Sequence, residues 1–318
     1  MVRSTIALQA VCCLFAGTVL AQDAVVSTPL REVHRRDSTI SIRVNSDLVL
    51  VPVLVTDNMD RVVTDMERSA FRIYDNAVEQ EISHFAQDDA PISIVLLFDS
   101  SGSMRNKLQE SRIAVAEFLK ASNPEDEFAL IEFNDKPKIL AHFTREPADI
   151  EAQLAHVAPW GRTALLDAVC LALGEMKRAR NTRKAILILS DGGDNHSRYR
   201  EREVKAWVRE ADAQIYSIGI LDRGGRWNSP EETAGPVLLN AIAEQSGGRY
   251  FEADGTDGLP EIAARIGSEL RNQYVIGYAP LSSEHNGGYH RITVKLEQPK
   301  GLPRLRATFR SGYLAPGQ

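Results

Sequence analysis

The chain has 318 residues, of which 43% are hydrophobic and 25% are charged, and its formal net charge is −6 at pH 7. These proportions are those of an ordinary globular protein, and the chain is long enough to rely on its own hydrophobic core. The acidic balance argues against general binding of nucleic acid.

The first residues are typical of a secretory signal peptide. Arg3 precedes an uncharged, largely apolar run over residues 6–20, and Ala21 offers a small residue at which cleavage can occur. The run is short for a membrane span of about 20 residues, although an uncleaved anchor is the alternative. We predict a signal peptide over residues 1–21, a solvated linker over residues 22–38, and a secreted, periplasmic or cell-envelope protein whose mature chain has no membrane span.

The three cysteines leave little scope for disulfides. Cys12 and Cys13 lie inside the expected signal peptide, so the mature chain would keep Cys170 alone and could form no internal disulfide. Cys170 belongs to an apolar helical stretch over residues 164–173. We expect it to be a buried small hydrophobic residue rather than a nucleophile.

Two flanking regions are strand-like and lack helical spacing. Each alone is small for a stable β domain. We therefore predict that the N-terminal flank (residues 39–90) and the C-terminal flank (residues 272–318) meet in one β-sandwich, with the intervening domain inserted into it. Two independent β modules are the alternative. The strand-like runs are 49–55 and 71–76 in the N-terminal flank and 274–278, 290–296 and 305–309 in the C-terminal flank.

The intervening residues 91–271 alternate strand and helix signals. Continuous apolar runs indicate buried strands, and longer stretches with apolar residues three and four positions apart indicate helices. This alternation predicts an α/β domain with a doubly wound, mostly parallel sheet and an antiparallel hairpin at one edge. The expected strands are 92–98, 128–133, 139–143, 185–190, 215–221 and 249–251, and the expected helices are 107–121, 164–178, 200–212, 237–245 and 259–270.

Three loops at or near the expected strand ends carry oxygen-bearing side chains, where ligands of such sheets bind. Asp99, Ser101 and Ser103 come from the Asp-Ser-Ser-Gly-Ser run after the first strand, Thr163 follows a Gly-Arg pair, and Asp191 follows a second apolar strand. Two carboxylates and three hydroxyls are hard ligands that suit Mg²⁺, or Mn²⁺, in octahedral geometry. The alternative is an ordinary N-capping Asp-Ser turn beside an unrelated Asp-Gly turn.

The spacing of the first loop has a physical reason. A loop that leaves a strand and turns into a helix can aim residues i, i+2 and i+4 at one point, and Gly102 permits the turn. We expect the helix to begin near Met104, so that its N-terminus adds positive potential to the site. Five protein oxygens at most would leave an octahedral ion at least one open position.

The set resembles the metal-ion-dependent adhesion site of von Willebrand factor type A domains, with a match at each of the five positions. The resemblance implies a Rossmann-like domain and a partner whose Asp or Glu supplies the sixth metal ligand. Residues 105–107, Arg-Asn-Lys, occupy the stretch where a second ion would need acidic residues, so we expect one ion. The flanks resemble exported bacterial VWFA-related domain proteins, and the likeness covers nearly the whole mature chain through residues 48–53, 65–79, 82–85, 272–278 and 310–313.

Two classes of function fit these residues. The first is an exported, metal-dependent protein-binding module, for adhesion or assembly, that engages an Asp or Glu of a protein partner. The alternative is a metal-dependent hydrolase that uses the Asp99 loop, but the sequence has no second carboxylate cluster and no recognised nucleophile or phosphate-loop motif. His196 is the one candidate base, and a solvent-exposed loop histidine is the simpler interpretation. We therefore expect a binding protein and no enzyme.

Loops around the expected metal carry arginine and tryptophan. Exposed side chains of these types are typical binding hot spots, and arginine favours carboxylates, so the expected ligand is an acidic protein or peptide segment. The alternative is that the charges are solvated and that Trp160 and Trp227 are packed anchors. The candidate partner-binding rim consists of Arg105, Arg162, His196, Arg223, Arg226 and Trp227.

Overall fold

The computed structural model describes residues 48–87, 89–221, 230–256, 258–280, 287–297 and 304–315, all of which belong to one compact unit of the chain. The expected signal peptide and linker lie outside these residues. Within them, no helix is both long and apolar enough to cross a membrane.

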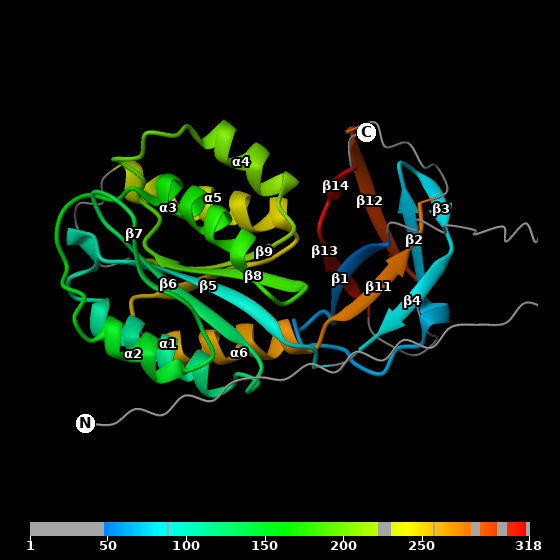
Figure 1. The fold of residues 1–318 in the computed structure, drawn as a ribbon, viewed down its shortest axis with the longest axis horizontal. Coiled ribbons are helices and arrows are strands. Elements are labelled where there is room, and N and C mark those ends of the chain that lie inside the picture. Colours follow the sequence, from blue (N-terminus) through cyan, green and yellow to red (C-terminus); the bar gives the residue numbers. More distant parts are fainter. Residues whose placement is uncertain are drawn as a thin grey trace, which may run out of the picture. The chain divides into compact units, whose positions relative to one another are not determined.

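A six-stranded sheet forms the centre of the domain between the two flanks (Figure 1). Its strand order is β10-β9-β8-β5-β6-β7, and all neighbours are parallel except β6 and β7. Every residue of β5 is buried, because helices cover both faces of the sheet. The strands are β5 (Ile92–Asp99), β6 (Glu127–Phe133), β7 (Lys138–Thr144), β8 (Arg183–Ser190), β9 (Gln214–Leu221) and β10 (Tyr250–Asp254).

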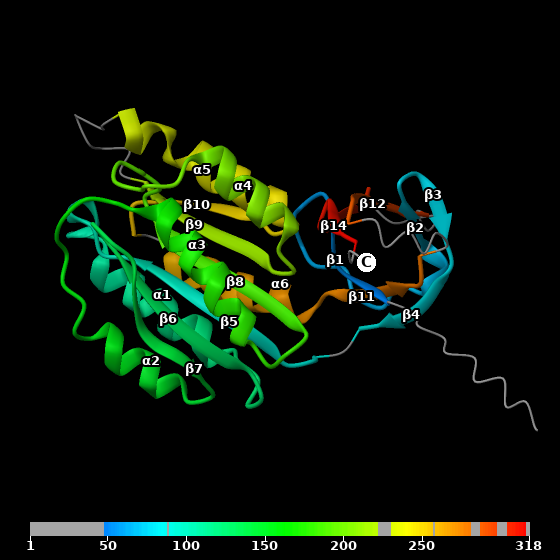
Figure 2. The ribbon, with the colours of Figure 1, turned by 45° about the horizontal axis from the view of Figure 1, so that its top comes forward.

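Helices lie on both faces of this sheet (Figure 2). One face is covered by α1 (Leu108–Lys120), α2 (Pro147–Leu154) and α6 (Leu259–Arg271), and the other by α3 (Leu165–Glu175), α4 (Glu201–Glu210) and α5 (Pro230–Ser246). The doubly wound, mostly parallel sheet expected from the sequence is confirmed.

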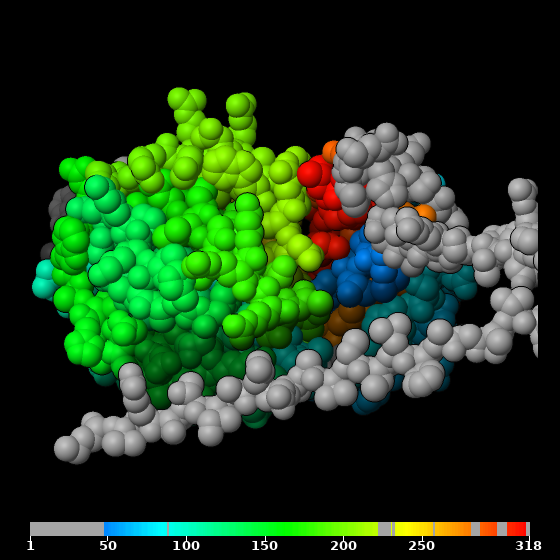
Figure 3. Space-filling model, in the orientation of Figure 1, coloured from blue at the N-terminus to red at the C-terminus, as the bar shows by residue number. Residues whose placement is uncertain are grey.

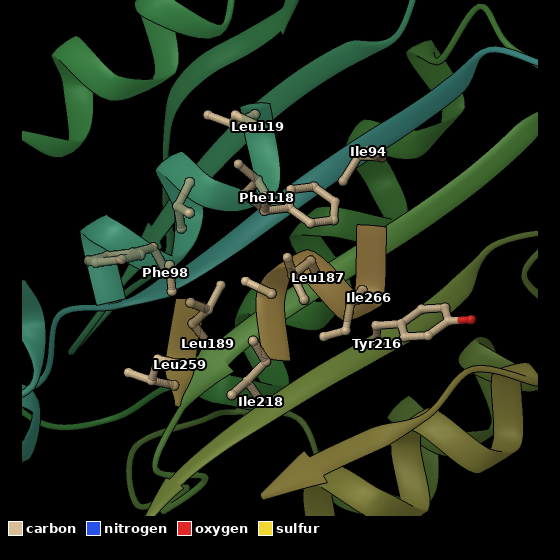
Figure 4. Close-up of a cluster of buried hydrophobic side chains, with 14 of the residues drawn as sticks. Ile94, Phe98, Phe118, Leu119, Leu187, Leu189, Tyr216, Ile218, Leu259 and Ile266 are labelled. Carbon is tan, nitrogen blue, oxygen red and sulfur yellow. The ribbon is translucent and has the colours of Figure 1, made fainter. Parts of the chain in front are cut away.

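Alternate residues of the strands feed two separate cores, because successive side chains of a strand point to opposite faces. Ile94 and Phe98 of β5 pack in one core with Phe118 of α1 and Ile266 of α6 (Figure 4). Val95, between them, packs in the other core with residues of α3, α4 and α5. The inserted domain therefore has a hydrophobic interior of its own.

Three helices differ from the sequence-based expectation. The helical spacing over residues 107–121 corresponds to α1, which begins at Leu108, but the helix start expected near Met104 is wrong, since Gly102–Met104 form a separate short 3-10 helix, η2. Helix α2, in which only Ile150 and Leu154 are buried, is not among the expected helices. Helix α5 begins earlier than expected and contains Pro236, a residue type that usually marks a helix end.

The two flanks form two four-stranded antiparallel sheets among the described residues, ordered β13-β1-β11-β4 and β14-β12-β2-β3. Strand β1 of the N-terminal flank pairs with β11 and β13 of the C-terminal flank, and β2 pairs with β12. Figure 3 shows blue atoms of the N-terminal flank beside red atoms of the C-terminal flank. The strands are β1 (Val49–Thr56), β2 (Phe71–Asp75), β3 (Val78–Gln80), β4 (Ile82–Ala86), β11 (Tyr274–Tyr278), β12 (Tyr289–Leu296), β13 (Arg306–Phe309) and β14 (Gly312–Leu314).

The two sheets of the flanks share one hydrophobic core. Val51 and Tyr274 of the first sheet and Ile73 and Ile292 of the second belong to the same buried cluster. This arrangement confirms the predicted β-sandwich built from both flanks, and the alternative of two independent β modules is wrong.

The two segments that join the β-sandwich to the inserted domain lie close together. Arg183, at the start of β8, donates from Nη1 to Ala90 O at 3.1 Å, and its guanidinium also contacts Leu270 O. Arg271 Nη1 donates to Asp89 Oδ1 at 2.6 Å. Such closely spaced ends allow one domain to be inserted into another.

Candidate metal centre

The first loop of the candidate site follows β5. Asp99 ends that strand and has no exposed surface, and its Oδ1 accepts a hydrogen bond from Ser101 N at 2.8 Å. The hydroxyls of Ser101 and Ser103 lie 3.1 Å apart. Gly102 lies so close to the second loop that an added Cβ would stand 3.2 Å from Gly161 O, to which its N–H donates. The loop therefore holds one carboxylate and two hydroxyls in a compact turn.

The second loop carries Thr163 and is hydrogen-bonded to the first and third loops. Trp160 N donates to Ser100 O of the first loop at 2.9 Å. Thr163 N donates to Asn195 Oδ1 at 3.0 Å, and Thr163 O accepts hydrogen bonds from the N–H groups of Asn195 and His196. Thr163 is buried, and these contacts fix its backbone between the first and third loops.

The third loop follows β8 and carries Asp191, whose residue is 3% exposed. Ser190, which closes the strand, donates from Oγ to Asp99 Oδ2 at 2.5 Å and so joins the third loop to the first. Gly193 N donates to Asp191 Oδ1 at 3.4 Å. Gly192 has a φ of +82°, a conformation that favours glycine and turns the chain sharply after Asp191.

The electrostatics of the site favour a cation. Burial and the charge of Asp191 raise the pKa of Asp99 to about 7. Asp191 Oδ2 is buried and accepts no hydrogen bond from any described residue. Lys107 Nζ lies 3.6 Å from that oxygen. A buried carboxylate oxygen without a hydrogen bond is costly, and a bound cation removes that cost.

The chemistry of the donor set suits a hard divalent cation. No group of three or more His, Cys, Asp or Glu side chains that could hold a metal occurs in the described part of the chain. An ion at this centre therefore depends on hydroxyl oxygens as well as carboxylates, a combination that suits Mg²⁺ or Mn²⁺.

The five predicted site residues lie on three adjoining loops. Their role as metal ligands stays a prediction. Three further residues take part in the site and were not predicted: Ser190 bonds Asp99, Asn195 holds the Thr163 backbone, and Lys107 faces Asp191. Ser190 is the polar residue that closes an apolar strand next to Asp191, and this was the available signal for it.

The described rim residues are exposed. The Arg162 backbone N–H donates to Asp135 Oδ1 at 2.7 Å, and Arg162 Nη1 lies 3.4 Å from His196 Nδ1. Arg105 is exposed, and Trp160 is 56% exposed, so Trp160 is not a packed anchor. The other rim candidates, Arg223, Arg226 and Trp227, lie outside the described residues.

Comparison with known proteins agrees with this architecture. The family model described as von Willebrand factor type A domain matches residues 94–193. Inter alpha-trypsin inhibitor, heavy chain 4, from Mus musculus is 26% identical over 217 residues, which cover 62% of this chain and 22% of that protein. An uncharacterized protein of Borreliella burgdorferi is 23% identical over 187 residues, which cover 52% of this chain and 54% of that protein.

The chain thus spans about a fifth of the length of the mouse relative and about half of the bacterial one. Among solved structures, proximal thread matrix protein 1 from the mussel byssus superposes with a TM-score of 0.50 at 20% identity, covering 62% of this chain and 51% of that one. At that identity the likeness concerns the fold. The matched residues include Asp99, Thr163 and Asp191, the strands β6 and β8, and most of β5. Residues 94–193 of the chain thus match the von Willebrand factor type A domain family.

Proposed function

We propose that this protein is a divalent-cation-dependent protein-binding module, for adhesion or assembly, that engages an Asp or Glu side chain of its partner. Domains of the von Willebrand factor type A family are typically protein-interaction modules. The observation that carries the proposal is the buried Asp191 Oδ2, which accepts no hydrogen bond from the described residues and lies in a loop joined to those of Asp99 and Thr163.

The proposed ligands divide by chemistry. Ser101, Ser103 and Thr163 would bind the ion mostly directly, and Asp99 and Asp191 would bind it directly or through water. We propose Mg²⁺ as the ion, with Mn²⁺ as the other candidate. The ion would supply an electrophilic position that accepts a carboxylate of the partner.

The residues around the site support binding rather than catalysis. His196, the candidate base of a hydrolase, has an exposed side chain whose Nδ1 lies beside Arg162. A hydrolytic site needs a base within reach of the attacking water and its substrate, and no described contact joins His196 to Asp99. The exposed arginines of the rim suit an acidic partner instead. We also propose that the chain is exported, which rests on residues 1–21.

The test of metal binding is the Asp99→Ala variant. This change should abolish Mg²⁺ binding in titration calorimetry, because it removes a buried carboxylate from the ligand set, and it should leave the far-ultraviolet circular dichroism nearly intact. Asp149→Ala is the matched control, since Asp149 is an exposed carboxylate in α2 that bonds only Thr144 in the described contacts. Wild-type affinity in Asp99→Ala would refute the assignment.

The test of partner binding uses the same variant. Proteins captured from an extract of the source organism in Mg²⁺ should be lost in EDTA and lost with Asp99→Ala. Partners retained under both conditions would show that the metal centre is not the binding site.

A further inference from the structure

We infer that Lys107 is a built-in counter-cation of the metal centre, which partners Asp191 in the metal-free protein and lowers the affinity of the centre for divalent ions. The inference rests on the proposed function and deepens it, because it names a residue that sets the affinity of the site for the divalent ion.

The backbone of Lys107 is fixed at the start of α1. Its N–H donates to Met104 O at 2.9 Å, and its carbonyl accepts hydrogen bonds from Ser111 N at 3.0 Å and Ser111 Oγ at 2.8 Å. The side chain is 12% exposed. Lysine is rarely this buried unless its charge is paired. The helix start therefore places a positive charge inside the site rather than on its rim.

The partner of that charge is the carboxylate oxygen that has no hydrogen bond. Lys107 Nζ lies 3.6 Å from Asp191 Oδ2, beyond ordinary hydrogen-bond distance. The two charges attract each other, but Asp191 Oδ2 keeps its lone pairs free for a further ligand. An ion pair of this kind stabilises the empty site without closing it.

The charge count of the site follows from these contacts. Asp99 and Asp191 provide two negative charges when ionised, and Lys107 cancels one of them. A divalent ion that binds Asp191 enters within a few ångströms of a fixed ammonium, and like charges at that distance repel each other strongly in a buried site. Lys107 thus opposes the entry of the ion, and the loaded site becomes more positive and more attractive to a carboxylate.

The variant that tests this is Lys107→Met, which keeps the length of the side chain and removes its charge. Mg²⁺ and Mn²⁺ should bind to it roughly tenfold more tightly than to wild type in titration calorimetry, a gain of about 1.4 kcal/mol. Lys107→Arg keeps the charge and should bind the ions more weakly than Lys107→Met. If Lys107→Met does not fold, Lys107→Gln replaces it with the same expectation.

Lys120→Met is the matched control. It removes the same charge from the other end of α1, about 20 Å away along the helix. That distance exceeds the Debye length of about 8 Å at physiological salt, so the exposed Lys120 has little influence on the site. Its metal affinity should equal that of wild type.

A second experiment measures the stability of the protein without metal. In EDTA, Lys107→Met should lower the melting temperature, because it leaves the Asp191 carboxylate buried without a counter-charge. In an Asp191→Asn background the same change should have a much smaller effect, and the double-mutant cycle measures the coupling.

The outcomes separate the two proposals. If wild type binds neither Mg²⁺ nor Mn²⁺, the proposed function fails, while the coupling measured in EDTA still supports or overturns the ion pair. If wild type binds the ions and Lys107→Met binds them no more tightly, the inference about Lys107 is overturned and the proposed function stands. Absence of coupling between Lys107 and Asp191 also overturns the inference.

Discussion

At the scale of single residues, the metal loops depend on a close approach by α5. A Cβ at Gly235 would stand 2.5 Å from Asp191 O and 2.7 Å from Gly192 C, distances that real Cβ atoms essentially never show. Gly235→Ala must therefore displace the backbone beside Asp191. We expect Mg²⁺ affinity to fall at least tenfold, or about 1.4 kcal/mol, and the free energy of unfolding to fall by about 1–3 kcal/mol.

The matched control is a glycine in another helix of the same domain. A Cβ at Gly174 in α3 would meet no atom within 4 Å. Alanine is the better helix former, so Gly174→Ala should raise the free energy of unfolding by about 0.5–1 kcal/mol in urea titrations and leave Mg²⁺ affinity unchanged. Equal metal affinities in the Gly174→Ala and Gly235→Ala variants would show that the close approach of α5 does not position the metal-binding loop.

Cys170 should be chemically inert in the folded protein. It is half-buried, less than the sequence led us to expect, yet burial and the nearby Asp167 carboxylate raise the pKa of its thiol to about 12. At pH 8 roughly one thiol in ten thousand is then ionised, against about a quarter for an unperturbed cysteine with a pKa of about 8.5. Ellman's reagent at pH 8 should react at least a hundredfold more slowly with the native protein than with the urea-unfolded chain. Similar rates in the two states would contradict the raised pKa.

The candidate ligands could be found from the sequence because their side-chain chemistry is unusual at strand ends. Asp99 and Asp191 each follow an apolar run, and the hydroxyls recur at alternate positions of one loop. Lys107 could not be found in this way. The direction of a side chain in a loop follows no sequence period. The sequence is therefore equally consistent with Lys107 on an exposed rim.

At the scale of elements, hydrophobic patterning predicted the buried strands better than the helices. Strands β5, β8 and β9 are mostly apolar and almost fully buried because both faces of the sheet are covered. Helix α2 is a polar surface helix with two buried residues, which leaves almost no pattern to detect. Helix α5 contains Gly235 and Pro236, residue types that read as helix breakers, and tertiary contacts with the metal loop explain the glycine.

The strands of the β-sandwich are joined by a buried polar network around Asp75, at the end of β2. Its Oδ2 accepts hydrogen bonds from the hydroxyls of Tyr278 in β11 at 3.0 Å and Tyr313 in β14 at 2.9 Å, and its Oδ1 lies 2.9 Å from His290 Nδ1 in β12. Burial raises the pKa of both tyrosines, so their hydroxyls stay protonated and donate. One carboxylate thus links three strands of the C-terminal flank to one of the N-terminal flank.

Loss of this carboxylate should destabilise the β-sandwich. Asp75→Ala leaves two buried hydroxyls and a histidine without their shared acceptor, so we expect the free energy of unfolding to fall by about 3 kcal/mol. Tyr278→Phe removes one donor while Tyr313 still satisfies the same oxygen, and it should cost about 1 kcal/mol. Urea titration of both variants measures the difference. A loss in Asp75→Ala no larger than that in Tyr278→Phe would show that the network is not cooperative.

At the scale of the whole molecule, neither flank can complete a sheet alone. Strand β1 lies between β11 and β13, and among the described strands the only neighbour of β4 is β11. The metal loops, in contrast, all belong to the inserted domain, whose two cores are formed by residues between Ile92 and Leu270. The topology therefore separates the stability of the β-sandwich from the integrity of the site.

Deletion of residues 272–318 tests this separation. It removes β11, β12, β13 and β14, so β1 and β4 lose their described strand partners and the apolar side chains of Val51 and Ile73 lose much of their cover. We expect residues 48–87 to become sensitive to protease, with cleavage mapped by mass spectrometry, and the inserted domain to remain resistant and to keep its Mg²⁺ affinity. Removal of residues 316–318 alone, which leaves every described strand in place, is the control and should change neither property. An N-terminal flank that resists protease as well as in the full chain would mean that it folds without the C-terminal flank, and a loss of Mg²⁺ binding would mean that the site depends on the β-sandwich.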